Sequence, residues 1–269
     1  MLQPSHDRPL RHRKWHRQAA EPHTKASRRM ITRRIAASLS FLAMTEGGAA
    51  VAHAQAYQCR SPSVASVPQI APDGPRRDTP VTGYTLALSW SPEFCKPREE
   101  SRAHRVQCSG DNGRFGLVVH GLWPQSARGS WPQWCAAQTR LTPAQIRKHM
   151  CMMPSARLIA RQWAKHGSCM TKRPQTYLGV TRILWNSLRI PDYDRISRED
   201  GLTAGRIRSA FADANGSSWQ PGHIGVKLNE RGWLQEIRLC YSRRFRPTRC
   251  DDARFGARDD VAARIWRGL

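Results

Sequence analysis

Eight cysteines constrain this chain of 269 residues more than any other feature, because all of them fall between residues 59 and 250. They are Cys59, Cys95, Cys108, Cys135, Cys151, Cys169, Cys240 and Cys250. An even number of cysteines in an exported chain is typical of a disulfide framework. Metal binding is the alternative, but after residue 54 no Cys-x-x-Cys or His-x-x-x-His pair offers the usual spacing of zinc ligands. The sequence therefore predicts four disulfides and no metal site.

Export is indicated by residues 30–54, which have the organisation of a signal peptide. Arg33-Arg34 precedes an apolar run over 35–44, and Ala52-His53-Ala54 provides a small-x-small cleavage site. The apolar run is too short for a membrane span, which needs about 20 apolar residues. We therefore expect a periplasmic or secreted protein without stable insertion into a membrane.

The signal peptide divides the chain into parts of different character. Residues 1–29 are polar and rich in Arg and His, and Met30 stands where a start codon would produce a normal signal peptide. We expect 1–29 to be either disordered or upstream of the true start. Residues 55–80 are rich in Pro, Ser and Ala without an apolar period, which indicates a loose N-terminal segment. Residues 81–269 then form one domain of ordinary size.

Positive charge dominates the whole chain and also its mature part. The chain has 44 Lys and Arg against 20 Asp and Glu, a net charge of +24. Without residues 1–54 it keeps 34 basic and 17 acidic side chains, a net charge of +17. Clustered cations gain affinity for a polyanion by releasing its counterions, so this balance favours a nucleic acid as partner. A generally basic surface is the alternative, because net charge bears on association and not on a specific site.

Apolar periodicity predicts strands and helices that do not alternate strictly. Strand patterns cover residues 84–90, 115–120, 224–228 and 234–241, and the last two form a hairpin. Helical patterns start at 142–143 and cover 155–166, 174–188 and 203–214, while a polar loop holds Cys95 and Cys108. We therefore expect an α+β fold, a single domain in which a central, mainly antiparallel sheet is flanked by helices and stapled by disulfides.

Two histidines lie at the ends of predicted elements. His120 ends an apolar strand that we expect to be central and begins the string 120–124, His-Gly-Leu-Trp-Pro. His166 ends a helix within Lys165-His166-Gly167-Ser168-Cys169. Alone, the first could bond to backbone and the second could complement a helix C-terminus. Together, two histidines flanking a phosphate make an acid–base pair, and Lys165 adds a charge that stabilises a phosphorane-like oxyanion, which indicates a nuclease.

These two strings resemble the signature segments of the ribonuclease T2 family, the secreted acid-type endoribonucleases. The similarity continues through residues 86–92, 202–215 and 235–240 and covers about 84–250. The resemblance implies that 81–269 is a catalytic domain that cleaves single-stranded RNA, and not DNA, without a metal or cofactor. The ribose 2′-OH would attack its own phosphate and expel the 5′-oxygen, leaving a 2′,3′-cyclic phosphate and then a 3′-phosphate. We expect a monomer.

The resemblance assigns a role to each matching residue. It makes His166 the general base on the 2′-OH and His120 the general acid for the leaving oxygen. Lys165 would stabilise the charged transition state. Trp123 would help to form an apolar site where a base stacks, an interaction that contributes about 1–3 kcal/mol without reading sequence.

The chain departs from the family just before Trp163, where it has Arg161-Gln162 in place of the usual His-Glu. Arg161 can still bind phosphate through its bidentate fork, but it cannot share a proton. Gln162 occupies a catalytic position and keeps a hydrogen-bonding amide, yet it lacks the carboxylate that would tune neighbouring pKa values. We therefore expect reduced activity with a shifted pH optimum.

The resemblance also implies how the cysteines pair. It joins Cys135 to Cys169, which would tie the loop after His120 to the helix that bears His166. Cys95–Cys108 and Cys240–Cys250 would be local pairs, which leaves Cys59 with Cys151.

Two other classes of function compete with the ribonuclease. An exported relative without activity could bind RNA or another polyanion through its basic surface, but such a binder would not need both histidines and Lys165. A metal-dependent nuclease or phosphoesterase is disfavoured, because no cluster of Asp and Glu accompanies either histidine.

Overall fold

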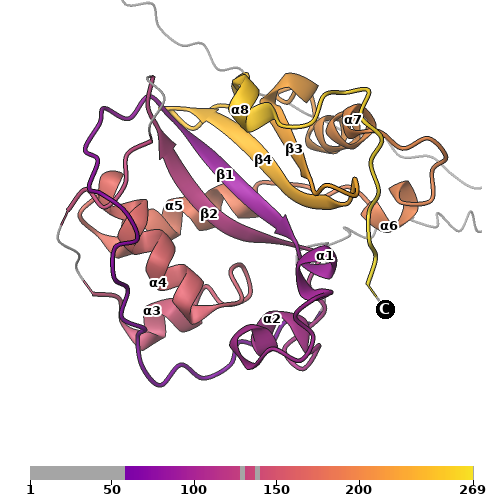
Figure 1. Cartoon of the computed structure of the whole chain (residues 1–269). Helices are drawn as coiled ribbons and strands as arrows, with labels where there is room; N and C mark the ends of the chain where they lie inside the picture. Colours follow the sequence, from indigo (N-terminus) through magenta and orange to yellow (C-terminus); the bar gives the residue numbers. More distant parts are fainter. Residues whose placement is uncertain (1–57, 128–130, 137–139, 269) are drawn as a thin grey trace, which may run out of the picture. The chain divides into compact units, whose positions relative to one another are not determined.

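Four antiparallel strands form the sheet on which the rest of the domain is arranged (Figure 1). The computed structural model describes residues 58–127, 131–136 and 140–268, so the predicted signal peptide and the extension before it lie outside the described residues. The strands are β1 (Gly83–Trp90), β2 (Leu117–Gln125), β3 (Ile224–Leu228) and β4 (Leu234–Ser242). Their order in the sheet is β2-β1-β4-β3, with every neighbouring pair antiparallel.

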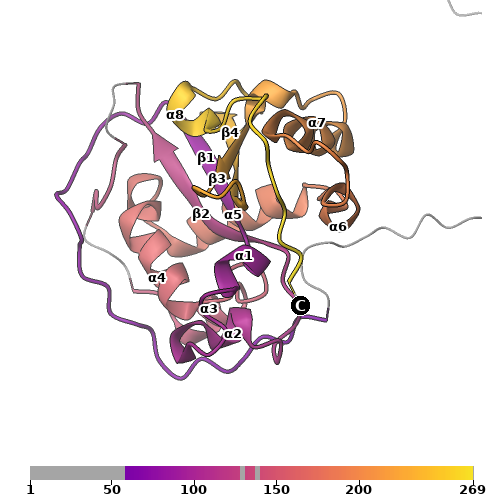
Figure 2. The same cartoon turned by 45° about the vertical axis from the view of Figure 1, so that its right-hand side comes forward.

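Helices lie between and around these strands, which confirms the expected α+β fold. They are α1 (Ser91–Cys95), α2 (Arg105–Cys108), α3 (Pro143–Arg147), α4 (Ala156–Lys165), α5 (Pro174–Asn186), α6 (Tyr193–Ile196), α7 (Ala204–Asn215) and α8 (Asp252–Phe255). Short 3₁₀ turns occupy Arg102–His104, Gly167–Cys169 and Pro221–His223. Figures 1 and 2 show α4 beside β2 and α7 beside β3.

The sequence predicted only a polar loop between the first two strands, and the structure differs from this prediction. Two short helices, α1 and α2, occupy that loop, and each ends at one cysteine of the disulfide between Cys95 and Cys108. Isolated helices of one turn are unstable, because nucleation costs more than a single hydrogen bond returns. The disulfide and the packing of α1 on α2 stabilise these two helices, and the local sequence pattern shows neither of them.

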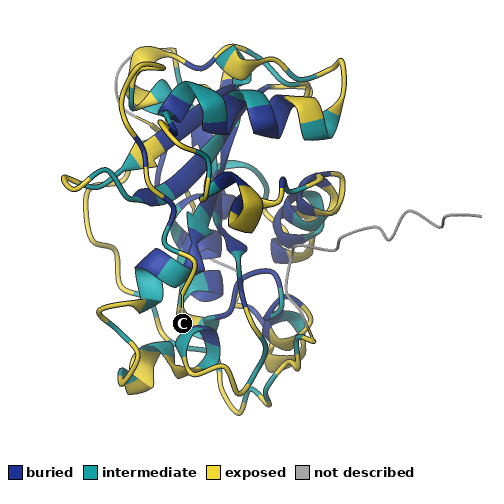
Figure 3. Ribbon diagram, turned by 90° about the vertical axis from the view of Figure 1, so that its right-hand side faces the viewer, coloured by how far each residue is buried: buried dark blue, intermediate teal, exposed yellow. Residues whose placement is uncertain are grey.

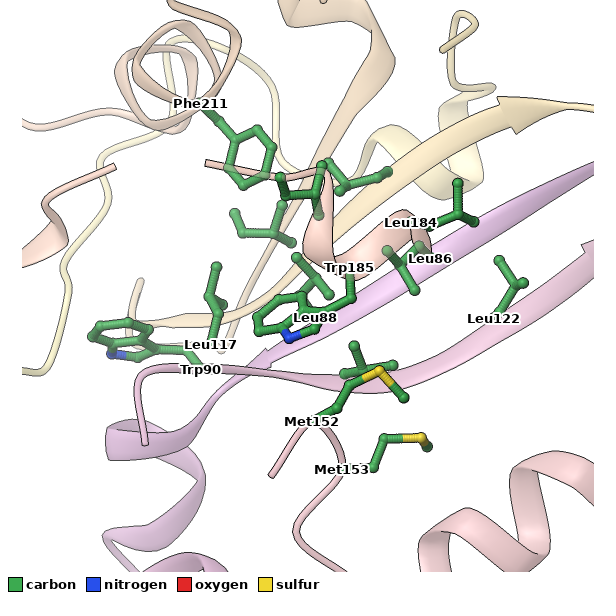
Figure 4. Packing of buried hydrophobic residues seen from close by; sticks show 14 of the residues in the cluster. Leu86, Leu88, Trp90, Leu117, Leu122, Met152, Met153, Leu184, Trp185 and Phe211 are labelled. Atoms are coloured by element: carbon green, nitrogen blue, oxygen red, sulfur yellow. The ribbon is translucent and has the colours of Figure 1, made fainter. Parts of the chain in front are cut away.

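Alternation along the strands gives the sheet one apolar face and one polar face. Leu86 and Leu88 of β1 point into the apolar face, where Leu184 and Trp185 of α5 lie close to them and Phe211 of α7 belongs to the same buried cluster (Figure 4). Figure 3 shows that most residues of the strands are buried. The opposite face carries the polar residues of the candidate site. One face of the sheet therefore packs the hydrophobic core, and the other carries the candidate site.

Strand β2 lies at an edge of the sheet, and the expectation that it is central is wrong. The strand is apolar because other segments of the chain cover this edge and bury it. The N–H of Val119 donates to the carbonyl of Met152 at 2.9 Å. The hydroxyl of Tyr177 on α5 accepts from the N–H of Leu122 at 3.2 Å and donates to its carbonyl at 3.1 Å. The unpaired backbone groups of an edge are thereby satisfied inside the protein.

Four disulfides form: the three pairs that the family resemblance implied, and Cys59–Cys151, which elimination had left. Cys135–Cys169 links the segment after β2 to the turn that follows α4. Cys59–Cys151 fastens the N-terminal segment, which forms no helix or strand over residues 58–82 apart from one bridge between Arg77 and Gln133. No helix in the described ranges is long and apolar enough to cross a membrane.

Replacing Cys135 and Cys169 with serine should lower the free energy of unfolding by roughly 2–5 kcal/mol. Urea unfolding monitored by tryptophan fluorescence measures the loss. The matched control replaces Cys95 and Cys108, whose bond spans 13 residues where Cys135–Cys169 spans 34, and the chain-entropy model predicts a smaller loss for it. Equal stability of wild type and the first variant would contradict the expectation, as would peptide mapping that finds Cys169 unpaired.

Candidate active site

His120 lies at a bulge in the middle of β2, and not at the end of the strand as the sequence indicated. The pairing with β1 runs up to Val119 on one side and to Gly121 on the other, so His120 has no partner on β1. A bulge turns a side chain away from the regular alternation of a strand. The side chain of His120 is 38% exposed and accessible to a ligand.

The imidazole of His120 faces a buried carboxylate on β4. Its Nδ1 lies 2.8 Å from Oε2 of Glu236, and Oε1 of Glu236 accepts a hydrogen bond of 2.8 Å from Nε of Arg238. Burial acts to raise the pKa of this carboxyl, but the hydrogen bonds from His120 and Arg238 hold the pKa below its usual value. A charged carboxylate only accepts hydrogen bonds, so Nδ1 carries the proton and Nε2 is left for a ligand.

His166 is buried, unlike His120. It follows the last turn of α4, where its N–H donates to the carbonyl of Gln162. Burial has the largest effect on the pKa of this imidazole, and the charges of Lys165, His120 and Arg161 lower the pKa further, to about 3. The ring is therefore neutral near neutral pH and able to accept a proton. Its buried Nδ1 has no hydrogen-bond partner among the residues that the structure describes.

The indole of Trp123 connects the two histidines. Its ring centroid lies 5.1 Å from that of His120, in an edge-on arrangement, and 5.9 Å from that of His166. Its Nε1 donates to Oε1 of Gln162 at 2.8 Å. Gln162 is buried against Gly121, where any Cβ would collide with the Gln162 amide and with the indole nitrogen. The glycine of the motif is therefore required for space, so that β2 and α4 can approach each other.

Two cations on α4 converge on one carboxylate from the N-terminal segment. Nζ of Lys165 donates to Oδ1 of Asp73 at 3.0 Å, and Arg161 pairs with Oδ2 of the same group. Burial acts to raise the pKa of Asp73, but the hydrogen bonds from Lys165 and Arg161 outweigh it and lower the pKa to about 2. The carboxylate is therefore charged at any pH above about 3. Arg161 and Lys165 are four residues apart, which places them on the same side of the helix.

Each histidine lines a cavity of its own. A cavity of about 450 Å³ is bounded by Trp123, Trp131, Lys165 and His166. Arg238 of β4 and Arg254 of α8 also line it, together with Asp251, which pairs with Arg254. His120 and Glu236 line a second cavity of about 560 Å³, with Phe94 and Leu158 as apolar neighbours. Both cavities have apolar and charged walls, a combination that suits a ligand with flat bases and an anionic backbone.

The structure brings together all the residues that the sequence predicted to be catalytic or substrate-binding. These are His120, Trp123, Arg161, Gln162, Lys165 and His166. Asp73 and the role of Glu236 were missed, because a single Asp in a Pro-rich segment and a Glu in an alternating strand carry no local signal. No group of three or more His, Cys, Asp or Glu side chains within the described ranges is placed to hold a metal ion.

Comparison with known proteins gives a consistent result over most of the described chain. Residues 82–250 match the model of the Ribonuclease T2 family. A protein of Haemophilus influenzae named "Probable ribonuclease" is 30% identical over 190 residues, which cover 66% of this chain and 64% of that protein. A protein of Aeromonas hydrophila named "Ribonuclease" is 44% identical over 86 residues, which cover 32% of this chain and 36% of that protein. The chain therefore spans less than two thirds of the length of these two relatives.

A solved structure shares the fold. It is trichomaglin, described as a novel S-like ribonuclease, which has a TM-score of 0.53 at 20% sequence identity. The match covers 64% of this chain and 92% of that structure. At this level of identity the likeness shows the fold alone.

The electrostatics of the site predict the titration of His166. Its imidazole should titrate far below 6.5, at about 3. Lys165→Gln should raise the pKa of His166, because removing a nearby cation favours the protonated ring. NMR of ¹⁵N-labelled histidines measures both values, with Lys172→Gln as a control on the chain just after the site. A His166 that titrates near 6.5 in wild type, or is unaffected by Lys165→Gln, would contradict this description of the site.

Proposed function

The chain belongs to the ribonuclease T2 family, and from that premise we propose that it is an exported endoribonuclease that cleaves single-stranded RNA by transesterification, without a metal ion. The observation that carries the proposal is a pair of histidines beside one indole, in opposite surroundings. A buried carboxylate holds Nδ1 of His120, whereas burial and neighbouring cations favour the neutral ring of His166. Surroundings that differ in this way divide two titratable groups into an acid and a base.

We assign the general base to His166 and the general acid to His120. The neutral ring of His166 takes the proton of the ribose 2′-OH, and the 2′-oxygen attacks the adjacent phosphorus. The bond from phosphorus to the 5′-oxygen breaks, and His120 gives its proton to that oxygen. The products are a 2′,3′-cyclic phosphate and a 5′-OH end. Water then opens the ring with the roles reversed, so that His166 returns a proton to the 2′-oxygen and a 3′-phosphate remains.

The remaining residues bind the substrate and its developing charge. Lys165 and Arg161 supply positive charge for the non-bridging phosphate oxygens, which become more negative in the transition state. Trp123 and the exposed Trp131 line the cavity of His166 and offer flat surfaces on which bases stack. Because stacking does not read hydrogen bonds, we expect broad base preference.

Glu236 and Gln162 act as positioning residues for the two histidines. Glu236 holds Nδ1 of His120, which directs Nε2 towards the leaving oxygen. Gln162 accepts the indole N–H of Trp123, a hydrogen bond that a glutamate at this position would also accept. The departure from the family motif at 162 therefore keeps the packing of the site and removes a charge beside His166.

The disulfides and the basic residues support proposals about where the protein acts and on what substrate. Four disulfides form and persist in oxidising compartments, which supports an exported protein, periplasmic or secreted. The relatives named as ribonucleases and the basic walls of the His166 cavity support RNA as the substrate. We also propose that the protein acts as a monomer.

A relative that binds RNA without cleaving it is the second candidate. Position 162 favours it, because an amide there cannot exchange a proton with the substrate or with His166. The two candidates differ in the need for both histidines, which binding alone does not require.

The purified protein should cleave single-stranded RNA at undiminished rate in EDTA and leave DNA of the same sequence intact, because the attacking group is the 2′-OH. His120→Ala and His166→Ala should each lower kcat by about 10²–10⁴-fold. Gel analysis of a labelled oligonucleotide measures both effects. Loss of cleavage in EDTA, or cleavage of DNA, would refute the proposal.

If wild type binds RNA but cleaves it no faster than the two histidine variants, the binding protein is the correct reading. Gln162→Glu then identifies the cause. A gain of cleavage in that variant would show that the site lacks only its carboxylate.

A further inference from the structure

Asp73 occupies the place where the proposed function requires a phosphate. Its two carboxylate oxygens contact Lys165 and Arg161, the two cations assigned to the scissile phosphate. Asp73 comes from a segment without helix or strand, 83 residues or more before α4 along the chain. Nothing in the assigned reaction uses this carboxylate. We propose that Asp73 is an internal phosphate mimic, which RNA must displace from Lys165 and Arg161 and which thereby sets the affinity of the enzyme for its substrate.

The segment around Asp73 is built into the wall of the site. Arg77 and Gln133 exchange two backbone hydrogen bonds of 2.9 Å, and the side chain of Gln133 donates to the carbonyl of Pro75 at 2.8 Å. The next residue, Trp134, donates its N–H to the carbonyl of Lys165 at 2.8 Å. The backbone that presents Asp73 is therefore joined to the backbone of the lysine that Asp73 binds. This connection distinguishes the contact from a chance pairing of two mobile side chains.

A carboxylate held by a guanidinium and an ammonium is a close chemical analogue of a bound phosphate. The side chain of Lys165 is 16% exposed, so its pairing with Asp73 is less screened by water than a surface ion pair. With Asp73 in place, one negative charge already offsets the two cations. A phosphate group entering the site meets one net positive charge where two would otherwise be available. The enzyme therefore binds RNA, and any product that keeps a terminal phosphate, with lower affinity.

A positioning role for Asp73 is the alternative, in which the carboxylate holds both cations ready for the substrate. The two roles predict opposite changes. Removing an internal competitor strengthens phosphate binding and lowers KM, whereas removing a positioning residue weakens binding or lowers kcat. A surface ion pair of no consequence predicts no change in either quantity.

The test compares Asp73→Asn with Asp78→Asn, a matched control in the same segment. Asp78 is 66% exposed, pairs with Arg76 and does not touch Lys165 or Arg161. Isothermal titration with inorganic phosphate should show about fivefold tighter binding to Asp73→Asn, the effect of removing one screened like charge at about 4 Å. KM for single-stranded RNA should fall by a similar factor at nearly constant kcat, and Asp78→Asn should behave as wild type.

A second variant controls for the packing of the segment. Asp73→Glu keeps the charge and should bind phosphate as weakly as wild type, even if the segment shifts. Weaker phosphate binding in Asp73→Asn, or lower kcat without a fall in KM, would establish the positioning role and overturn the proposal. Unchanged phosphate binding would also overturn it.

This inference rests on the proposed function, but the two fail in different ways. Phosphate titration requires no cleavage, so it tests Asp73 even in a protein that does not cut RNA. If wild type cleaves RNA normally and Asp73→Asn binds phosphate as wild type does, the role of Asp73 alone is refuted.

Discussion

The hydrogen bond from the indole of Trp123 to the amide of Gln162 joins the strand that bears His120 to the helix that bears His166. It forms only because Gly121 leaves room for the amide against β2. The same indole then contacts both imidazoles. The disulfide between Cys135 and Cys169 and the backbone bond from Trp134 to Lys165 hold the neighbouring segments to this contact. The geometry of the site therefore depends on how closely β2 and α4 approach each other.

Within this geometry, the two imidazoles differ only in their environments, and the proposed roles of acid and base rest on that difference. His120 is partly exposed and bonded to a buried carboxylate, whereas His166 is buried among cations. Burial among cations favours the neutral ring of His166, and the carboxylate fixes the orientation of His120. The sheet makes this possible, because its apolar face packs on α5 and α7 and leaves the other face free to carry buried charges such as Glu236. Asp73 also changes the electrostatics of the site, because its carboxylate pairs with the two cations that we assign to the substrate phosphate.

The sequence was sufficient for features that repeat along the chain or belong to a motif. Helix α4 was predicted from its apolar spacing, and the hairpin of β3 and β4 from alternation on either side of a turn. Features that depend on distant segments were not predictable. The apolar pattern of β2 suggested a central strand, but Met152 and Tyr177 cover what is in fact an edge. The bulge at His120 depends on the register with β1, and the contacts of Asp73 join residues about 90 positions apart, which no local pattern encodes.

The division between acid and base is tested most directly with an RNA substrate in which sulfur replaces the 5′-bridging oxygen at one position. A thiolate leaves without receiving a proton, because the pKa of a thiol is about 8.5 and far below that of an alcohol. A general acid is then dispensable, while the 2′-OH must still lose its proton. On this substrate His120→Ala should recover nearly the rate of wild type, and His166→Ala should remain slow. Recovery by His166→Ala in place of His120→Ala, or by neither variant, would contradict the assignment.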